Sequence, residues 1–266
     1  MPQLHSKIIW ITGASSGIGK ELAMQLASQR NRLVLSARNV EALKEISLQC
    51  ESKGSETLVL PLDLENSAAF APAVEEVIKR FGGIDILINN GGISQRSLAA
   101  ETPIEIDRKM MEINYFGTVG LTKTVLPVML RQKRGQIAVI SSLSGKFGWA
   151  QRSAYAAAKH ALQGFFETLH IEMQSHGIDV NIVCPGRVNT PISLSALTKD
   201  GTAHGVKDAG QEKGIPVEVC VRKIIQGLEA HKPEIIIARS ERVVYLIHSI
   251  SKKWFYWLAA KVNPNN

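Results

Sequence analysis

A tyrosine and a lysine four residues apart are the clearest chemical feature of this sequence. Tyr155 and Lys159 fall in a segment that starts near Ser153 and has helical apolar spacing, so both side chains lie on one helix face about one turn apart. An ammonium beside a phenol favours the phenolate. A free tyrosine has a pKa near ~10, so action as a base near neutral pH requires a decrease of about 2 to 3 pH units, or roughly 3 to 4 kcal/mol. The same spacing occurs by chance on many exposed helices, so the pair needs partners elsewhere in the chain.

Two other polar residues are candidates for that partnership. Ser142 ends the apolar run 136–142, thirteen residues before Tyr155, and ligands of doubly wound sheets bind outside the carboxyl ends of the strands. Asn114 lies within the apolar helical pattern of residues 107–132, where a buried amide needs hydrogen-bond partners. A simple surface asparagine is the alternative for Asn114.

The first turn of the chain predicts a diphosphate site. An apolar run over 7–11 is typical of a strand buried on both faces, and the spacing after Gly19 is helical. The turn between them aims unpaired N–H groups and the positive end of a helix at one point, and glycines there let a diphosphate approach. A tight turn without a ligand is the alternative. The residues of this turn that we expect at a dinucleotide site are Gly13, Ser15, Ser16, Gly17, Ile18 and Gly19.

Strand and helix patterns alternate along most of the chain. Further strands are predicted at 32–38, 56–63, 84–89, 136–142, 179–184 and 234–238. Such alternation specifies a parallel sheet with right-handed crossovers. We therefore predict an α/β fold: a single doubly wound domain over residues 1–240, with about seven parallel strands and helices on both faces.

Arg38, at the end of the second predicted strand, bears on cofactor choice. An acid there would accept from a ribose 2′-hydroxyl, whereas a guanidinium offers forked donors to a 2′-phosphate. Arg38 therefore favours NADP(H) over NAD(H). A solvated surface arginine is the alternative.

Together these motifs resemble the short-chain dehydrogenase/reductase family. The glycine spacing is G-x-x-x-G-x-G, and Y-x-x-x-K follows a serine and a helical asparagine in the family's order, up to about residue 240. The resemblance implies a Rossmann fold and an oxidoreductase with hydride transfer. It implies that Tyr155 donates the proton in carbonyl reduction and that Ser142 donates a hydrogen bond to the substrate oxygen. Lys159 would bind the nicotinamide ribose and lower the tyrosine pKa. Asn114 would bend its helix and anchor a water that leads protons to Lys159.

The same resemblance implies further cofactor contacts. Asp63 would accept from the adenine amino group, although a cap for the helix containing Phe70 is equally open and compatible. Asn90 and Gly91 match the family's N-N-A-G, with glycine in place of alanine, and would lie close to the adenosine ribose. A P-G-x-V-x-T match, in which the valine backbone and threonine hydroxyl hold the carboxamide, comprises Pro185, Gly186, Val188 and Thr190; a plain Pro-Gly turn is the alternative.

A finer resemblance concerns the substrate. Lys20, Arg38, residues 114–118 and residues 152–155 are similar to the branch called dehydrogenase/reductase family members 7 and 7B, which implies a lipophilic ketone or alcohol. We interpret the chain as an NADP(H)-dependent carbonyl reductase and alcohol dehydrogenase, and expect a homodimer or homotetramer because homologous folds commonly pair through their long helices. A non-catalytic dinucleotide sensor and a membrane adaptor are alternatives, and the intact Ser142, Tyr155 and Lys159 argue against the sensor.

Composition excludes several other classes. The net charge is +7, but the basic residues form no long stripe or recognition motif, so no nucleic-acid partner is expected. Cys50, Cys184 and Cys220 are widely spaced and form no C-x-x-C pair, which predicts neither disulfides nor a metal site. With no secretory signal recognised, a cytoplasmic location is expected, either free or in contact with a membrane.

The last third of the sequence adds a lid and a tail. Residues 191–214 are polar with weak periodicity, which predicts a mobile lid over the substrate cleft. The tail, residues 241–266, contains Trp254, Phe255, Tyr256 and Trp257 beside lysines, and its apolar runs are too short to span a bilayer. A helix on a membrane surface, a site for a greasy substrate and burial against protein all stay open.

Overall fold

Seven parallel strands form the centre of the molecule. The computed structural model describes residues 4–261, and its sheet has the order β3-β2-β1-β4-β5-β6-β7 with every neighbouring pair parallel. This confirms the predicted doubly wound α/β fold. The strands are β1 (Ile8–Thr12), β2 (Arg32–Ser36), β3 (Glu56–Val59), β4 (Ile86–Asn89), β5 (Gly135–Ile140), β6 (Ile178–Pro185) and β7 (Glu234–Ile237).

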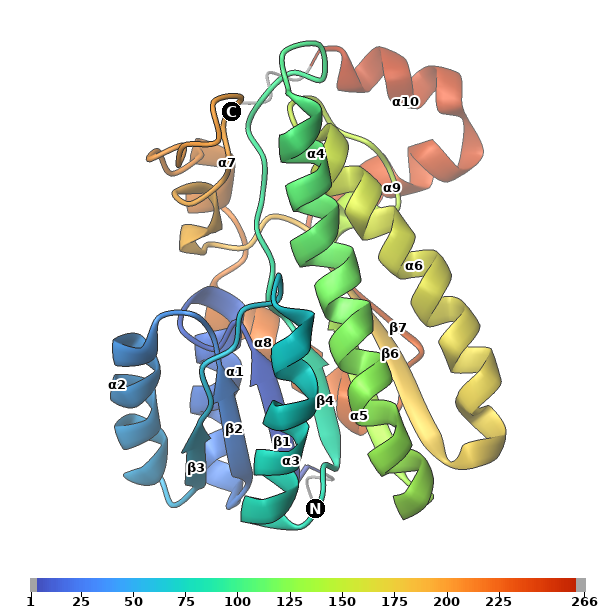
Figure 1. Ribbon diagram of the computed structural model, residues 1–266. Coiled ribbons are helices and arrows are strands. Elements are labelled where there is room, and N and C mark those ends of the chain that lie inside the picture. Colours follow the sequence, from blue (N-terminus) through green and yellow to red (C-terminus); the bar gives the residue numbers. More distant parts are fainter. Residues whose placement is uncertain (1–3, 262–266) are drawn as a thin grey trace.

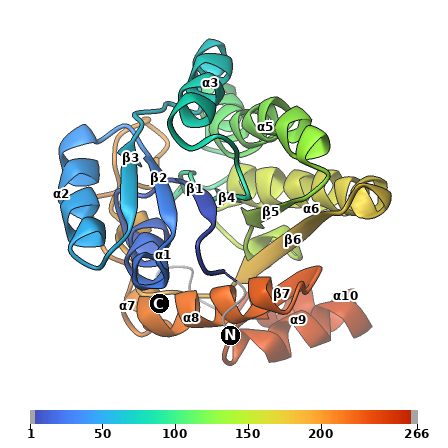
Figure 2. The same cartoon turned by 90° about the horizontal axis from the view of Figure 1, so that it is seen from below.

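Helices cover both faces of this sheet, as Figures 1 and 2 show. One face carries α1 (Gly17–Leu26), α2 (Val40–Glu51) and α8 (Val217–Glu229). The other carries α3 (Phe70–Phe81), α5 (Thr118–Gln132) and α6 (Ser153–Met173), with α4 (Ile104–Met111) leading into α5. The crossovers place the carboxyl ends of all seven strands on one side of the molecule, where a ligand can meet several loops at once.

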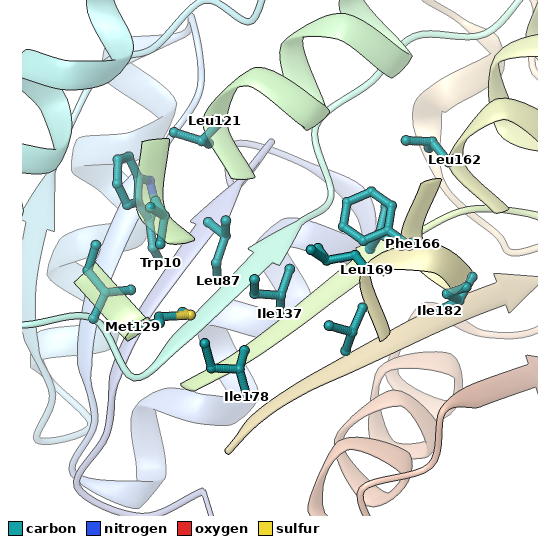
Figure 3. Packing of buried hydrophobic residues seen from close by; sticks show 14 of the residues in the cluster. Trp10, Leu87, Leu121, Met129, Ile137, Leu162, Phe166, Leu169, Ile178 and Ile182 are labelled. Carbon is teal, nitrogen blue, oxygen red and sulfur yellow. The ribbon is translucent and has the colours of Figure 1, made fainter. Parts of the chain in front are cut away.

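The hydrophobic core explains why these helices pack as they do. Figure 3 shows Trp10 from β1, Leu87 from β4 and Ile137 from β5 against the side chains of α5 and α6. All three are completely buried, as expected for strands covered on both faces. A second cluster joins α1, α2 and α8 to the opposite face of the sheet. The sheet is therefore a rigid platform for the loops at its edge.

One long predicted helix is interrupted. The pattern over 107–132 predicts one helix with a bend implied at Asn114, and the structure has a π-helical stretch, Glu112–Gly117, between α4 and α5. At Gly117, a Cβ would collide with the backbone carbonyl of Leu64, so the absence of a side chain lets this stretch lie close to the loop after β3. The widened turn contains the candidate residue Asn114, and such π turns are frequent at functional sites.

The segment 191–214 and the tail lie above the carboxyl edge of the sheet (Figure 1). The segment contains the short helix α7 (Ala209–Glu212) and pairs with residues 94–96 through backbone hydrogen bonds on both sides of Leu197. The tail forms α9 (Glu241–Ile250) and α10 (Lys252–Ala259). Within residues 4–261, no helix is both long and apolar enough to cross a bilayer.

Candidate active site

A single cavity of about 980 Å³ gathers nearly all of the predicted site residues at the carboxyl ends of the strands. A volume of this size suits a dinucleotide together with a small substrate. The predicted residues that line it are Gly13, Ser15, Ser16, Gly17, Ile18, Arg38, Asp63, Asn90, Gly91, Asn114, Ser142, Tyr155, Lys159, Pro185, Gly186, Val188 and Thr190. Gly19 is the exception.

The glycine turn has the conformation that an anion site requires. Gly13 and Gly17 have φ of 64° and 53°, in the left-handed region that favours glycine. Ser16 precedes α1, but its side chain does not cap the helix, and the first turn carries no acid. The first N–H groups of α1 thus have no side-chain partner at the cavity wall, and this arrangement fits a diphosphate.

Gly19 and Asn90 hold this turn in place. A Cβ at Gly19 would collide with the carbonyl of Gly13, so Gly19 allows close packing of α1 instead of lining the cavity as predicted. The Asn90 amide donates to the carbonyls of Thr12 and Gly13 at 3.0 and 3.2 Å. Thr12 Oγ1 in turn accepts from the N–H groups of Asn90 and Gly91 at 3.0 and 2.9 Å. The loop after β4 is thereby fastened to the loop after β1.

The two residues predicted at the adenosine end reach the cavity in different ways. Arg38 is exposed, and the described residues offer its guanidinium no hydrogen bond or ion pair. Asp63 lies beyond the end of β3, and its carboxylate accepts from the N–H of Glu65 at 3.1 Å. The alternative of a cap for the helix containing Phe70 is wrong, because Asn66 precedes the 3₁₀ turn that leads into α3.

Asn114 is completely buried, so the surface alternative is wrong. Its Oδ1 accepts from the Ile93 N–H at 2.9 Å, and its Nδ2 donates to the Ile93 carbonyl at 3.1 Å. Gly92 faces this amide, and a Cβ there would lie 2.5 Å from Asn114 Oδ1. The asparagine therefore fixes the loop after β4 beside Lys159.

Ser142, Tyr155 and Lys159 meet in the middle of the cavity. Ser142 follows β5, and its Oγ accepts from the Ser144 N–H at 3.1 Å. Its hydroxyl donates to the Pro185 carbonyl at 3.5 Å and lies near enough to the phenol of Tyr155 to lower its pKa. Lys159 Nζ lies 5.7 Å from the centroid of the Tyr155 ring and donates to the Ile140 carbonyl at 2.8 Å. The structure thus brings together the three residues that the sequence placed on two separate elements.

Burial dominates the proton affinities of this group. Burial raises the pKa of Tyr155, and Ser142 and the charges of Arg152 and Arg96 oppose that rise only in part. Ser142, Arg152 and Arg96 are the groups that lower this pKa here, so the lowering by Lys159 stays a prediction. Burial also lowers the pKa of Lys159 to about 8. The ammonium is consequently poised to lose its proton close to neutral pH.

Four functional candidates escaped the sequence analysis. Gln95, Arg96, Arg152 and Asp208 come from three distant segments, and all but Gln95 line the cavity. Gln95 Oε1 accepts from the N–H groups of Ala154 and Tyr155 and so caps the helix that carries the tyrosine. The polar run Ser94–Ser97 directly after a strand was the available signal. Nothing in the sequence could pair it with an acid more than 100 residues away.

A model of the short chain dehydrogenase family matches residues 7–200. The chain belongs to the short-chain dehydrogenase/reductase family. It is 40% identical over 240 residues to dehydrogenase/reductase SDR family member 7B of Rattus norvegicus, which covers 88% of this chain and 74% of that protein. It is 38% identical over 266 residues to dehydrogenase/reductase SDR family member 7 of Homo sapiens, across 98% of this chain and 78% of that one.

Solved structures of the family share this architecture. A short chain dehydrogenase/reductase from Burkholderia phymatum in complex with NAD superposes with a TM-score of 0.85, at 20% identity, over all of this chain and 99% of that chain. An alcohol dehydrogenase from Thermococcus sibiricus complexed with 5-hydroxy-NADP gives 0.75 at 25% identity, over 87% and 95% of the two chains. The chain is therefore an oxidoreductase with the general NAD(P)-dependent dehydrogenase or reductase activity of its family.

Proposed function

We propose that this short-chain dehydrogenase/reductase interconverts a carbonyl and an alcohol with NADP(H), using Tyr155 as the acid and base. The observation that carries the proposal is the meeting of Ser142, Tyr155 and Lys159 in one cavity with the uncapped start of α1. The nicotinamide, when bound, supplies or accepts hydride. The proton that accompanies it must come from the protein.

The side chains suggest how that proton is handled. Ser142 Oγ, beside the phenol, donates a hydrogen bond to the substrate oxygen and orients it. Tyr155 passes its proton to that oxygen during reduction and takes it back during oxidation. Lys159 binds the nicotinamide ribose, and its charge supports the phenolate. Asn114 anchors a water that carries protons to Lys159, while Val188 and Thr190 hold the carboxamide and so fix which ring face meets the substrate.

Replacement of the phenol tests this proposal. Tyr155→Phe should lower kcat by about two orders of magnitude or more while NADPH still binds, because only the proton donor is removed. The measurement is NADPH oxidation over a panel of ketones and aldehydes, with NADPH fluorescence as the binding assay. Near-normal turnover by the variant would refute the role. Tight NADPH binding by the wild type with no turnover of any compound would favour the dinucleotide sensor instead.

The preference for NADP(H) is supported by Arg38. Its guanidinium is exposed at the cavity wall, and it has no partner among the described residues. A forked, unengaged donor at this strand end is suited to a 2′-phosphate, and NAD(H) has none to offer.

A lipophilic substrate is supported by the apolar part of the cavity wall. That wall includes large apolar side chains beside the catalytic group, namely Leu143, Phe147, Trp149, Ile192, Leu194 and Val244. We propose a ketone or alcohol of steroid, retinoid or long-chain lipid type as the substrate.

We also propose that two or four copies of the chain pair through α5 and α6. Phe116 and Ile171, at 54% and 71% exposure near these helices, are apolar groups that such pairing would cover.

Peripheral membrane contact is supported by the tail. Phe255 is buried against Phe147, with ring centroids 5.4 Å apart, so one aromatic of the tail packs on the domain. Trp254, Tyr256 and Trp257 are 70%, 63% and 60% exposed. Aromatic rings beside Lys252, Lys253 and Lys261 suit the interface of an anionic membrane. Val244 of α9 lines the cavity, so that contact would lie near the entrance for a lipophilic substrate.

A further inference from the structure

A buried ion cluster lies next to the catalytic tyrosine. Asp208 Oδ2 accepts from Arg96 Nε at 2.9 Å and from Arg152 Nη2 at 3.1 Å, and Arg96 Nη2 also donates to it. The side chains of Arg96 and Asp208 are only 2% and 8% exposed. Two guanidinium groups thus share one carboxylate oxygen in the wall of the active-site cavity.

The cluster joins three segments that are distant in sequence. Arg96 belongs to the loop after β4, Arg152 directly precedes α6, and Asp208 directly precedes α7 in the segment 191–214. Arg96 is fixed by its own loop as well, because Nη1 donates to Ser94 Oγ and to the Gln95 carbonyl. Asp208 is anchored by its own N–H, which donates to Ser193 Oγ at 3.2 Å. The carboxylate is therefore the counter-ion between two guanidinium groups, and Arg96 has bonds that do not depend on it.

The charges of the cluster act on Tyr155. Arg152 and Arg96 both lower its pKa, against the larger effect of burial. Burial alone would raise the pKa of Asp208, but the hydrogen bond and charge of Arg96 and the charge of Arg152 bring it below its ordinary value, so Asp208 is an anion at neutral pH. It offsets one of the two positive charges. The other charged or titratable groups around the tyrosine and this cluster are Lys159, Arg187 and His204, whose Nε2 is 3.7 Å from Asp208 Oδ1.

We propose that Asp208 is a positioning residue that sets the proton affinity of Tyr155. Its carboxylate cancels part of the field of Arg96 and Arg152, which line the same cavity as the phenol. The segment 191–214, which covers the substrate cavity, is thereby coupled to the acid that protonates the substrate. The inference rests on the proposed role of Tyr155, but it makes a claim about the phenol that is measurable without turnover.

Charge changes of opposite sign should shift the pKa of Tyr155 in opposite directions. Asp208→Asn leaves two positive charges without their counter-ion, so the phenol should become more acidic by about 1 pH unit. Arg152→Gln removes a positive charge, so the phenol should become less acidic by a similar amount. A unit charge close to an ionisable group has an effect of about this size.

The readout is ¹⁹F NMR of the full chain labelled with 3-fluorotyrosine. The resonance of residue 155 is assigned by its loss in Tyr155→Phe, and its chemical shift is followed against pH. Asp200→Asn is the matched control, because it makes the same change at an exposed position of the same segment. Arg222→Gln is the second control, since it removes the same charge from an exposed position of α8.

The outcomes separate this inference from the proposed function. The inference is supported if the titration midpoint of Tyr155 shifts in opposite directions in Asp208→Asn and Arg152→Gln and stays in place in both controls. Titrations that coincide with that of the wild type in a folded Asp208→Asn overturn it. If Asp208→Asn does not fold, Arg152→Gln compared with Arg222→Gln decides, and equal midpoints overturn the inference. Normal turnover by Tyr155→Phe would refute the proposed function whatever these titrations show.

Discussion

At the residue scale, Lys159 shows how the fold makes an ordinary side chain reactive. The amine is only 5% exposed, and burial lowers its pKa from 10.5 to about 8. The folded protein therefore disfavours the charged amine by about 3 kcal/mol relative to water. Since the unfolded chain binds this proton more tightly, Lys159 makes folding more favourable as pH rises from about 8 to 10.5. Below about pH 8 the buried ammonium lowers the free energy of unfolding. A charge kept at this cost to stability indicates a role in function.

Arg38 makes a prediction that belongs to a single side chain. Arg38→Asp should reverse the preference from NADPH toward NADH, because a carboxylate repels a 2′-phosphate and accepts from a 2′-hydroxyl. We expect the ratio of kcat/KM for NADPH to that for NADH to fall about 100-fold, the equivalent of roughly 2.7 kcal/mol. The measurement is steady-state kinetics with both cofactors and one ketone. Arg30→Asp, outside the cavity lining, is the matched control, and an unchanged ratio in Arg38→Asp would remove the assignment.

At the element scale, α6 owes its start to a residue from another part of the chain. Arg152 precedes the helix, but its side chain does not cap it. Gln95 Oε1 does so instead, at 2.9 Å from the Ala154 N–H and 3.3 Å from that of Tyr155. Gln95 is completely buried, and its amide donates to hydroxyls that include Ser97 and Thr102. The loop after β4 thus determines where α6, the helix that carries the catalytic tyrosine, begins.

Gln95→Met should therefore damage both the helix start and the activity. Two buried N–H groups lose their acceptor, which costs about 1 to 3 kcal/mol, and Tm should fall by several degrees. Because Tyr155 is in the first turn of α6, kcat should fall more than NADPH binding weakens. The measurements are thermal unfolding and steady-state kinetics. Gln49→Met, at an exposed position of α2, is the control, and equal melting and turnover in the two variants would contradict the capping role.

The elements also explain what the sequence could and could not predict. The apolar runs and glycine turns specified the parallel sheet and the places of Ser142, Tyr155 and Lys159, because these depend on local pattern and on the strand ends. The bend at Asn114 was implied, but its π-helical form was missed, since the close packing of Gly117 on Leu64 is a tertiary contact. The partners of Asp208 were missed for the same reason. The direction of the Tyr155 pKa depended on burial, which spacing alone does not report.

At the scale of the whole molecule, one edge of the sheet collects every function that we propose. The cofactor turn, the catalytic helix, the segment 191–214 and the tail all meet above the carboxyl ends of the strands (Figure 1). The tail is fixed there by Phe255, which packs on Phe147 and His248 at centroid distances of 5.4 and 4.8 Å. Its neighbouring aromatics point outward, and Ile250 is 85% exposed. A membrane under α10 would therefore lie beside the cavity.

Flotation of the full chain with liposomes tests this arrangement. The double variant Trp254→Ser/Trp257→Ser should bind vesicles of phosphatidylcholine with phosphatidylserine about tenfold less than the wild type, because two interfacial rings are lost. Leu48→Ser/Ile104→Ser is the matched control, since both side chains are exposed but lie on α2 and α4. Vesicles of phosphatidylcholine alone should bind the wild type more weakly, because the lysines of α10 then have no anionic partner. Equal flotation of the wild type and the tryptophan variant would remove the membrane contact and favour a protein partner for this surface.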